Sequence, residues 1–413
     1  MGIKNLTSIL NTHCKSAINK RNLDAYKGRI LGIDISIFLY KYLYMNDDHL
    51  EGIMRLLLRI VKNGILPLVI FDGRPPKEKS EVLTSRKEKR EYLVTKRDAI
   101  ETVMEIIRDR HDEMPKEELK KEIKKVIEKN QELKGENTKL EDEDIDELLV
   151  KNTEELKDEL EKTTKRIIYV RSEHIESTKA MLRFMGLPYL VSKGEAESLM
   201  GRLCAEGIID GCISEDTDVL VNGGKIFLRN IAADKNSVDE YCLEGILSGL
   251  EMSFEQFIDM CILCGCDYTT KIGGMGPQTA YKMMKKHGNL EDVLTELQKR
   301  PDKYEIPEGD NFDYVKARHL FLHSTDEEDR DEIKAKIRAT TPDLTNLILM
   351  MRSTKLGEKY FDEIQKSYMF YMSNIKKHLP MNSRELFIER PSSPPKEDKS
   401  GSKKITDFFS KNA

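Results

Sequence analysis

Short apolar runs that close on an acidic residue are the most informative pattern in this chain. Residues 29–36 and 66–72 are β-rich apolar runs with an aspartate near the end, and 209–214 is a similar run leading into a third acidic segment. Residues 53–63, between the first two runs, carry apolar side chains at helical spacing. Because open α/β sheets place polar groups beyond the carboxyl ends of their strands, the pattern predicts an α/β fold with acids at one sheet edge.

The rest of the core is also predicted to contain both helices and strands. The expected elements are a helix at 172–185, a strand at 187–192, a helix opening at Glu195, a strand at 225–231, and helices within 253–298 and 343–379. From residue 390 the chain is rich in Pro, Ser, Lys and Gly, which predicts a disordered tail.

A long charged stretch separates the strand predicted at 66–72 from the rest of the core. Within 99–165, apolar residues recur at helical spacing, regularly at first and less so toward the end. These residues are Leu119, Ile123, Val126, Ile127 and Leu133, then Ile145, Leu148, Leu149, Leu156 and Leu160. We predict a helical excursion from the sheet, such as a hairpin of helices; a solvated coiled pair or a partly disordered insert is the alternative.

Charge is separated sharply along the chain. The net charge is −5 over 413 residues, of which 34% are charged and 39% hydrophobic. Residues 74–97 hold nine Lys or Arg against four Glu, whereas 136–161 hold twelve acids against three Lys. No apolar run approaches the ~18 residues of a membrane span, and the polar N-terminus does not resemble a signal peptide. We therefore expect an intracellular protein with no membrane partner.

The cysteines fit the same compartment. Cys261, Cys264 and Cys266 form a cluster that zinc could use, but no second pair follows at a suitable spacing. We predict buried, reduced thiols.

Seven acidic residues occupy the predicted sheet edge and the segments next to it. They are Asp34, Asp72, Glu195, Glu197, Asp216, Asp218 and Asp267. Any one of them could be a solvated acid at a strand end or a helix N-cap. Gathered in one crevice, however, two carboxylates ~5 Å apart repel by roughly 3 kcal/mol at an effective dielectric of ~20. Divalent ions with oxygen ligands remove that repulsion, so the set predicts a metal site that can act on a phosphodiester.

A basic stretch follows the second of these acids. Lys79 and Arg86 are seven residues apart, which is two helical turns and therefore one helical face, and Lys89 and Arg90 extend it. One interpretation is a set of phosphate contacts. The other is a solvated basic helix whose charges pair with neighbouring glutamates.

A glycine-rich turn precedes another group of lysines. Gly274 and Gly276 stand in a Gly-Met-Gly-Pro turn, before a predicted helix that carries Lys282 and Lys285. Glycines let a backbone approach a phosphate closely, and a helix N-terminus offers free N–H groups. We therefore predict phosphate binding here rather than an ordinary turn.

These segments, in this order, resemble the flap endonuclease family of structure-specific 5′ nucleases (XPG-type). The likeness begins at MGIKNL, runs through the acidic segments and GGMGP, and ends at KKITDFF. It implies a central sheet flanked by helices (a PIN-like nuclease core), with a helical arch insertion and a C-terminal helix–turn–helix DNA-binding element. The implied regions are an N-terminal nuclease region 1–98, an arch 99–165, an internal nuclease region 166–265, a helix–turn–helix with C-terminal helices 266–380, and a disordered tail 381–413.

The resemblance also implies roles for the residues above. Two Mg²⁺, for which Mn²⁺ can substitute, would be held by one sub-site of Asp34, Asp72, Glu195 and Glu197 and another of Asp216, Asp218 and Asp267. Lys79 and Arg86 would act as electrostatic clamps on the scissile phosphate. Loop carbonyls near Gly274 would hold a K⁺ ion. Tyr40 matches a tyrosine that stacks on a base at the cleavage junction, with a position in the core as the equal alternative.

The last residues of the tail have a resemblance of their own. Ile405, Phe408 and Phe409 match the hydrophobic residues of the box with which replication proteins bind a sliding clamp. That box normally opens with Gln, where this chain has Ser402. Two adjacent Phe in a disordered tail have no packing role, so we predict that they bind a clamp.

Two features depart from the family. The stretch from Asp34 to Asp72 is shorter than in cellular flap endonucleases, which leaves open whether a pocket for a 3′ flap exists. The acidic insertion is longer, and we expect it to repel duplex DNA and gate access.

The predicted function is a metal-dependent 5′ flap endonuclease, with 5′→3′ exonuclease activity, acting on branched DNA in replication and repair. One alternative is a 5′→3′ exonuclease or a bubble-cutting repair nuclease. The alternative from another class is a non-catalytic, clamp-tethered DNA-junction binder. We expect a monomer located in the nucleus, or in a viral replication compartment.

Overall fold

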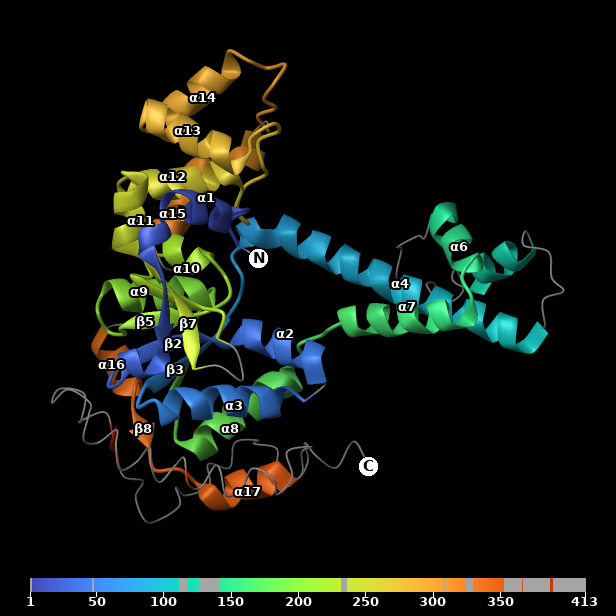
Figure 1. The fold of residues 1–413 in the computed structure, drawn as a ribbon, viewed down its shortest axis with the longest axis horizontal. Helices are drawn as coiled ribbons and strands as arrows, with labels where there is room; N and C mark the ends of the chain where they lie inside the picture. Colours follow the sequence, from blue (N-terminus) through green and yellow to red (C-terminus); the bar gives the residue numbers. More distant parts are fainter. Residues whose placement is uncertain are drawn as a thin grey trace. The chain divides into compact units, whose positions relative to one another are not determined.

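The structure is a computed structural model, in which two compact units can be distinguished (Figure 1). It describes residues 2–46, 48–110, 118–126, 141–231, 236–307, 309–323, 330–352, 366 and 387–388. Unit 1 comprises Met1–Glu78 and Val170–Ala413, and unit 2 comprises Lys79–Tyr169. Unit 2 begins before residue 99, where the sequence placed the insertion, because one helix runs unbroken across that residue.

A seven-stranded sheet forms the centre of unit 1, with the strand order β1-β7-β6-β5-β2-β3-β4. Its parallel strands are β2 (Ile30–Asp34), β3 (Leu66–Phe71), β4 (Tyr189–Val191), β5 (Gly211–Ile213) and β6 (Ile226–Arg229). Antiparallel β7 (Ser237–Cys242) and β1 (Ile18–Asn22) complete one side. The five parallel strands confirm the sequence prediction. The sequence did not predict β1 and β7, because both are polar strands without an apolar run.

Helices cover both faces of the sheet, as predicted (Figure 1). Strand β3 shows the division, since Leu66, Leu68 and Ile70 pack in one core cluster while Val69 and Phe71 pack in the other. The first cluster includes side chains of α1 (Leu6–His13), α9 (Ala196–Ala205), α10 (Asp218–Val221) and α11 (Leu243–Leu250). The second includes side chains of α2 (Ile35–Asn46), α3 (His49–Lys62) and α8 (Ser172–Met185). Short 3₁₀ helices are η1 (Lys15–Ala17), η2 (Leu23–Tyr26), η3 (Lys77–Lys79) and η4 (Gly309–Phe312).

The C-terminal half of unit 1 is helical. Its elements are α12 (Phe254–Cys264), α13 (Pro277–His287), α14 (Leu290–Gln298), α15 (Tyr314–Leu322), α16 (Arg330–Lys336), α17 (Leu344–Arg352), and the parallel pair β8 (Ala339–Thr340) and β9 (Phe387–Ile388). Cys261, Cys264 and Cys266 are buried and free, which confirms the prediction of buried thiols. In the helix expected within 343–379, Leu347, Met350 and Met351 are buried, and apart from residue 366 the part after 352 lies outside the described residues.

The described residues of unit 2 fold into helices. They are α4 (Ser80–Arg110), residues 118–126, α6 (Asp142–Leu149) and α7 (Thr153–Arg166). Their buried apolar side chains form a core of their own: Ala99, Ile100, Val103, Ile123, Ile145, Leu148 and Leu156. The described residues of 99–165 therefore form helices, as the sequence predicts, and these helices pack against one another. Ile127 and Leu133 lie outside the described residues.

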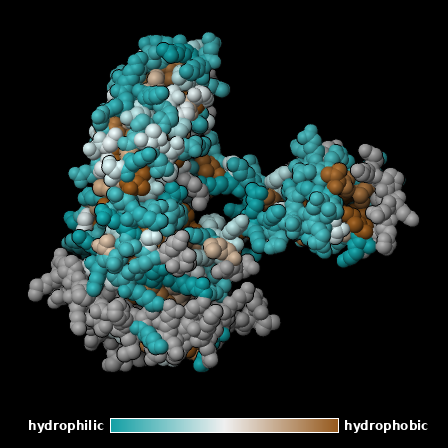
Figure 2. All heavy atoms as spheres, viewed as in Figure 1, coloured by the Kyte–Doolittle hydropathy of each residue, from teal (hydrophilic) through white to brown (hydrophobic). Residues whose placement is uncertain are grey.

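Most of the coloured residues on the face drawn in Figure 2 are hydrophilic, in keeping with the charged composition. Among the described residues, no helix combines the length and apolar character needed to cross a membrane.

Candidate active site

The carboxyl ends of three neighbouring parallel strands lie at one edge of the sheet. Asp34 is the last residue of β2, Asp72 follows β3, and Asp216 comes three residues after β5 ends. Since β2 lies between β5 and β3 with Asp34 opposite Ile70, the three strand ends are neighbours. Two short loops then start helices at this edge, with Glu195 at the N-cap of α9 and Asp218 as the first residue of α10.

Asp34 is the most enclosed of these acids, with only 2% of its surface exposed. Its Oδ1 accepts a hydrogen bond from the Ser36 N–H (3.1 Å), and its Oδ2 accepts one from the Ser214 hydroxyl (3.0 Å). Burial, followed by repulsion from Asp72 and Asp216, raises the pKa of Asp34 to about 7 against the weaker lowering effect of Ser214. The fold thus holds a carboxylate where a negative charge is poorly tolerated without a cation.

Glu197, in the first turn of α9, experiences the same field. Burial raises the pKa of Glu197 well above its ordinary value, and repulsion from Asp34, Asp72, Asp216 and Glu195 adds to the effect, in that order. These interactions show that the structure brings five of the seven predicted acids within electrostatic reach of one another.

Hydrogen bonds fix two more of these acids. The Ala196 N–H at the start of α9 donates to Asp72 Oδ1 (2.8 Å), which ties the end of β3 to that helix. The Tyr268 hydroxyl donates to Glu195 Oε2 (2.5 Å). Burial, together with nearby Glu195, Asp218 and Glu197, raises the pKa of Tyr268, so it stays a donor. Asp267, one residue before Tyr268, is thereby placed on the segment that reaches this edge.

The N-terminus also reaches the site. The Ile3 N–H donates to Asp218 Oδ1 (2.8 Å), and the Asp218 N–H donates to Asp216 Oδ1 (3.1 Å). Gly2 has a φ of +83°, and a Cβ added there would lie 1.9 Å from Asp216 Oδ1. Only glycine fits so close to this carboxylate. No sequence pattern predicts a role for Gly2, Ser214 or Tyr268. Each stands within two residues of a predicted acid or at the start of the chain, but nothing in that position indicates a contact.

The donor set fits hard divalent cations. All of the gathered side chains offer carboxylate oxygens, which Mg²⁺ and Mn²⁺ prefer, and the raised pKa values of Asp34 and Glu197 indicate unneutralised repulsion. Within the described residues, no three His, Cys, Asp or Glu side chains are already grouped around one ion position. Binding would therefore require these side chains to adjust.

The remaining predicted residues come from other elements of the chain. Tyr40 in α2 is 40% exposed, so the interpretation as a core residue is wrong; the neighbouring Tyr42 is buried instead. Gly274 has a φ of +72°, and a Cβ added there would lie only 2.2 Å from the Lys303 carbonyl oxygen. Gly276 is the N-cap of α13, on which Lys282 is exposed and Lys285 pairs with Glu251.

The basic stretch differs in one respect from its prediction. Lys79 closes the 3₁₀ helix η3, and α4 begins only at Ser80, so Lys79 and Arg86 do not share one α-helix. Pro75 and Pro76, just upstream, are compatible with a turn before a helix start but not with its interior. Lys89 is exposed, and the Arg90 guanidinium lies 4.8 Å from the centre of the Tyr169 ring. Ile405, Phe408 and Phe409 lie outside the described residues.

Carboxylates gathered where the parallel strands of an α/β sheet end are the arrangement expected of a metal-dependent nuclease. Comparisons with known proteins support this class of protein. The family model described as the XPG N-terminal domain matches residues 1–92, and that of the XPG I-region matches 186–267. Flap endonuclease 1-A of Sorghum bicolor is 31% identical over 84% of this chain and 81% of the relative. Flap endonuclease 1-B of Physcomitrium patens is 32% identical over 84% and 88%.

Solved structures share the fold. The catalytic core of Rad2 in complex with a DNA substrate has a TM-score of 0.60 at 20% identity, covering 89% of this chain and 100% of that one. Flap endonuclease-1 from Methanococcus jannaschii has a TM-score of 0.54 at 21% identity, covering 87% and 96%. The chain therefore belongs to the XPG-type flap endonuclease family of structure-specific 5′ nucleases, as its sequence predicted. This is a family of metal-dependent nucleases.

Proposed function

We propose that this protein hydrolyses phosphodiesters at 5′ flaps of branched DNA, with two divalent ions held at the acidic sheet edge. The observation that supports this most is the gathering of Asp34, Asp72, Glu195, Glu197 and Asp216 at adjoining strand and helix ends. A non-catalytic junction binder would gain nothing from such mutual repulsion, so catalysis is the better explanation.

We propose that the acids divide into two sub-sites. Asp34, Asp72, Glu195 and Glu197 would hold one ion, and Asp216, Asp218 and Asp267 the other. Two Mg²⁺, or Mn²⁺ in their place, would supply an activated water and neutralise charge on the phosphate. Ser214 and Tyr268 each donate to one oxygen of a carboxylate, which orients Asp34 and Glu195 as ligands.

Basic and aromatic residues would then position the DNA. Lys79 and Arg86 would stabilise the scissile phosphate in the transition state, and unit 2 would serve as the helical arch. Lys89 and Arg90 would contact the DNA strand that lies beside them. The exposure of Tyr40 supports a role in stacking on a base at the cleavage junction.

The turn at Gly274 and Gly276 and helix α13 would grip the duplex as a helix–turn–helix element. The positive φ of Gly274 and the N-terminus of α13 support phosphate binding, with a K⁺ ion held by the loop carbonyls. Lys282 would contact phosphate directly. Lys285 would have to break its ion pair with Glu251 before it could contact a phosphate. Its contribution to DNA affinity should therefore be smaller than that of Lys282.

A substrate panel tests this function. Labelled 5′ flap, gapped, nicked and bubble DNAs, with and without Mg²⁺, should show divalent-dependent cleavage that is fastest on the flap. Preference for free 5′ ends or bubbles would favour the exonuclease or repair-nuclease alternative. Binding without cleavage of any of them would favour the junction binder. Because the flap endonucleases of Sorghum bicolor and Physcomitrium patens are eukaryotic, we propose a location in the nucleus, or in a viral replication compartment if the source is a virus. The monomeric state stays a prediction from the family resemblance.

We also propose that the tail binds a DNA sliding clamp through Ile405, Phe408 and Phe409. Burial of these side chains gives roughly 5–8 kcal/mol before the cost of ordering the tail, so a complex on the order of micromolar is expected. Calorimetry of the tail peptide with the host clamp should show binding that Phe408→Ala with Phe409→Ala abolishes and Ser402→Gln tightens. A double-Phe variant that still binds would contradict the proposal.

A further inference from the structure

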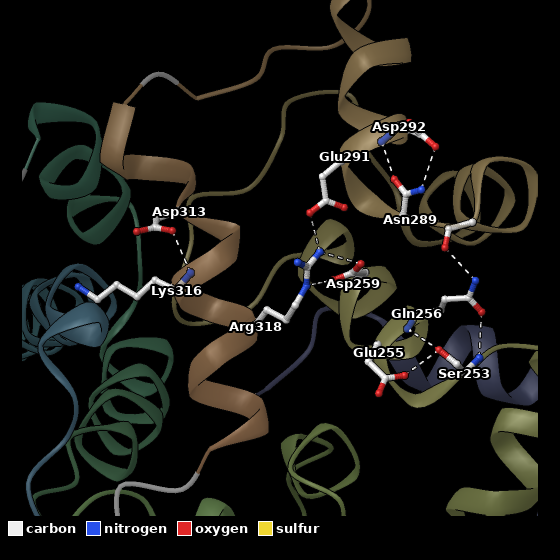
Figure 3. A network of polar contacts seen from close by, with 11 residues as sticks. Ser253, Glu255, Gln256, Asp259, Asn289, Glu291, Asp292, Asp313, Lys316 and Arg318 are labelled. Carbon is white, nitrogen blue, oxygen red and sulfur yellow. Dashed lines mark hydrogen bonds and ion pairs between the residues drawn. The ribbon is translucent and has the colours of Figure 1, made fainter.

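Helix α15 is fixed firmly in unit 1. Arg318 donates to both carboxylate oxygens of Asp259 (2.7 and 2.9 Å) and to Glu291 (3.1 Å), which ties α15 to α12 and α14 (Figure 3). On the same helix, Phe321 packs against the ring of Tyr268, with 5.0 Å between centroids. Tyr268 also donates a hydrogen bond to Glu195 at the acidic edge, so it links α15 to that site.

Lys316 leaves α15 on the other side from Arg318 (Figure 3). Its backbone N–H is held by the N-cap residue Asp313 (2.9 Å), so the root of the side chain is fixed. Its ammonium lies 2.7 Å from Glu78 Oε1. The hydrogen bond from Lys316 is the main reason that the pKa of Glu78 falls below its ordinary value.

Glu78 lies in the segment that joins the acidic edge to the basic stretch. The first part of this segment is fixed by backbone hydrogen bonds, from Gly73 to Gly194 O (2.8 Å) and from Arg74 to Lys193 O (3.1 Å). After Pro75-Pro76 comes η3, a single 3₁₀ turn, which is a weak element without outside support. The ion pair with Lys316 supplies such support one residue before Lys79.

We propose that the Lys316–Glu78 ion pair positions Lys79 for the cleavage reaction. Lys316 is a positioning residue here, since it acts on Lys79 through Glu78. The inference rests on the function proposed above, in which Lys79 stabilises the scissile phosphate. Because Lys316 is 56% exposed, the pair adds little to global stability, and variants should fold normally. Its effect should appear in how well the η3 turn is held.

The first test measures order in η3 without DNA. Hydrogen exchange of a peptide covering 77–82 should quicken about fivefold in Lys316→Ala and in Glu78→Gln, because a local opening becomes easier. Exchange at residues 73–74 should stay unchanged. The charge swap, Glu78→Lys with Lys316→Glu, should restore slow exchange. Lys299→Ala is the matched control, since Lys299 is also an exposed lysine in an ion pair, with Glu296 (3.1 Å) at the C-terminal end of α14. Unchanged exchange in both single variants would overturn the proposal.

The second test measures single-turnover cleavage of a 5′ flap and flap affinity in Ca²⁺. Lys316→Ala and Glu78→Gln should lower the rate about three- to tenfold with little change in affinity, because a small misplacement of a catalytic group is costly. The charge swap should recover most of the rate, and Lys299→Ala should match the wild type. In a Lys79→Ala background, Lys316→Ala should cause no further loss.

The outcomes separate this inference from the function on which it rests. An equal loss from Lys316→Ala with and without Lys79 would mean that Lys316 acts on something else, and the proposal would be wrong. A wild type that cleaves none of the DNAs would refute the proposed function and the catalytic part of this inference. The exchange measurement would still report whether the ion pair holds η3.

Discussion

The carboxylates of the two units have opposite electrostatic surroundings. At the sheet edge of unit 1, Asp34 faces other acids, and burial with repulsion raises the pKa of Asp34 to about 7. In unit 2, Glu159 is also partly buried, but hydrogen bonds from Lys151 and Lys96 outweigh that burial and lower the pKa of Glu159. Similar interactions hold Asp144 to Tyr92 (2.9 Å) and Asp146 to Lys120 (2.7 Å).

The contrast distinguishes acids that stabilise the fold through ion pairs from acids whose mutual repulsion destabilises it. Paired acids join helices of unit 2 to one another. Lysines of the same unit therefore neutralise part of its acidic block, the acid-rich residues 136–161. Acids gathered chiefly among other acids oppose folding and are explained by an ion that binds later. Sequence counts of charge cannot make this distinction, because the count is the same in both cases.

The sharpest test of the contrast is the loss of one acid from each unit. Asp216→Ala or Asp72→Ala should reduce Mg²⁺-dependent flap cleavage below detection, because each removes a metal ligand. Both variants should bind a flap in Ca²⁺ and unfold no more easily than the wild type, since like-charge repulsion is relieved. Asp146→Ala, which breaks the pair with Lys120, should leave cleavage unchanged. Near-normal turnover in either site variant would refute the two-metal assignment.

A second test uses the pH dependence of stability in a chelator. The ordinary pKa of Asp34 is 3.8, and the folded value is about 7. The folded protein therefore keeps a proton that the unfolded chain has released, so its unfolding free energy should fall as pH rises through this window and level off above about 7. At most about 4 kcal/mol is expected, and Glu197 adds to it with the same sign.

The Asp34→Asn variant is the control, because its amide cannot ionise. The difference between the two proteins, measured by denaturant unfolding from pH 4 to 8, should shrink when Mg²⁺ is added at high pH. Parallel curves for the two proteins would mean that Asp34 is solvated rather than confined.

A third test asks whether the basic residues of unit 2 act on rate rather than on binding. Lys79→Ala and Arg86→Ala should lower the single-turnover rate about 10²-fold, in the range seen for groups that stabilise transition-state charge, with little effect on affinity. Lys87→Ala, which loses an exposed partner of Glu91 in the same stretch, should change neither. Equal losses of rate and affinity would make Lys79 and Arg86 ordinary phosphate contacts.

A fourth test concerns the N-terminus at the acidic edge. Gly2→Ala should lower cleavage about tenfold, because its Cβ would displace Asp216, and the positive φ should cost roughly 1–2 kcal/mol. Gly207→Ala is matched to it, with a φ of +71° but no atom within 4 Å of the added Cβ. That variant should lose stability and keep full activity. Equal activity in the two variants would show that the site adapts to the added carbon.

How far sequence reasoning reached depended on the kind of feature. Apolar runs ending on Asp34 and Asp72 identified buried parallel strands and the edge where they end, because burial on both faces leaves a continuous hydrophobic signal. Strands β1 and β7 have no such signal, since β1 is largely polar and exposed, and in β7 polar residues separate the buried Val238 and Tyr241. The pairing of β1 with β7 is long-range and antiparallel, which composition alone does not indicate.

In the active site, too, only features with a signal in the local sequence were predictable. Acids were found because their type and order are informative, whereas Tyr268, Ser214 and Gly2 contribute single contacts that only the fold creates. The same is true of Lys316 and Glu78, which are separated by most of the chain. Lys79 was expected on the face of an α-helix but closes a 3₁₀ turn, because the helix starts one residue later.

The smallest expected effect concerns the acidic block of unit 2 and the idea that it repels duplex DNA. Because several of its acids are paired, the repulsion should come from exposed ones such as Glu143 and Asp158. Glu143→Gln with Asp158→Asn, which keep shape and remove two charges, should raise duplex affinity about two- to threefold near 0.05 M salt. The gain should fade by about 0.2 M, as screening shortens the reach of both charges. Lys162→Gln, a change of opposite sign on α7, should lower affinity under the same conditions. Fluorescence anisotropy across a salt series measures all three proteins, and reduced affinity in the acid variants would make unit 2 a binding arm rather than a barrier.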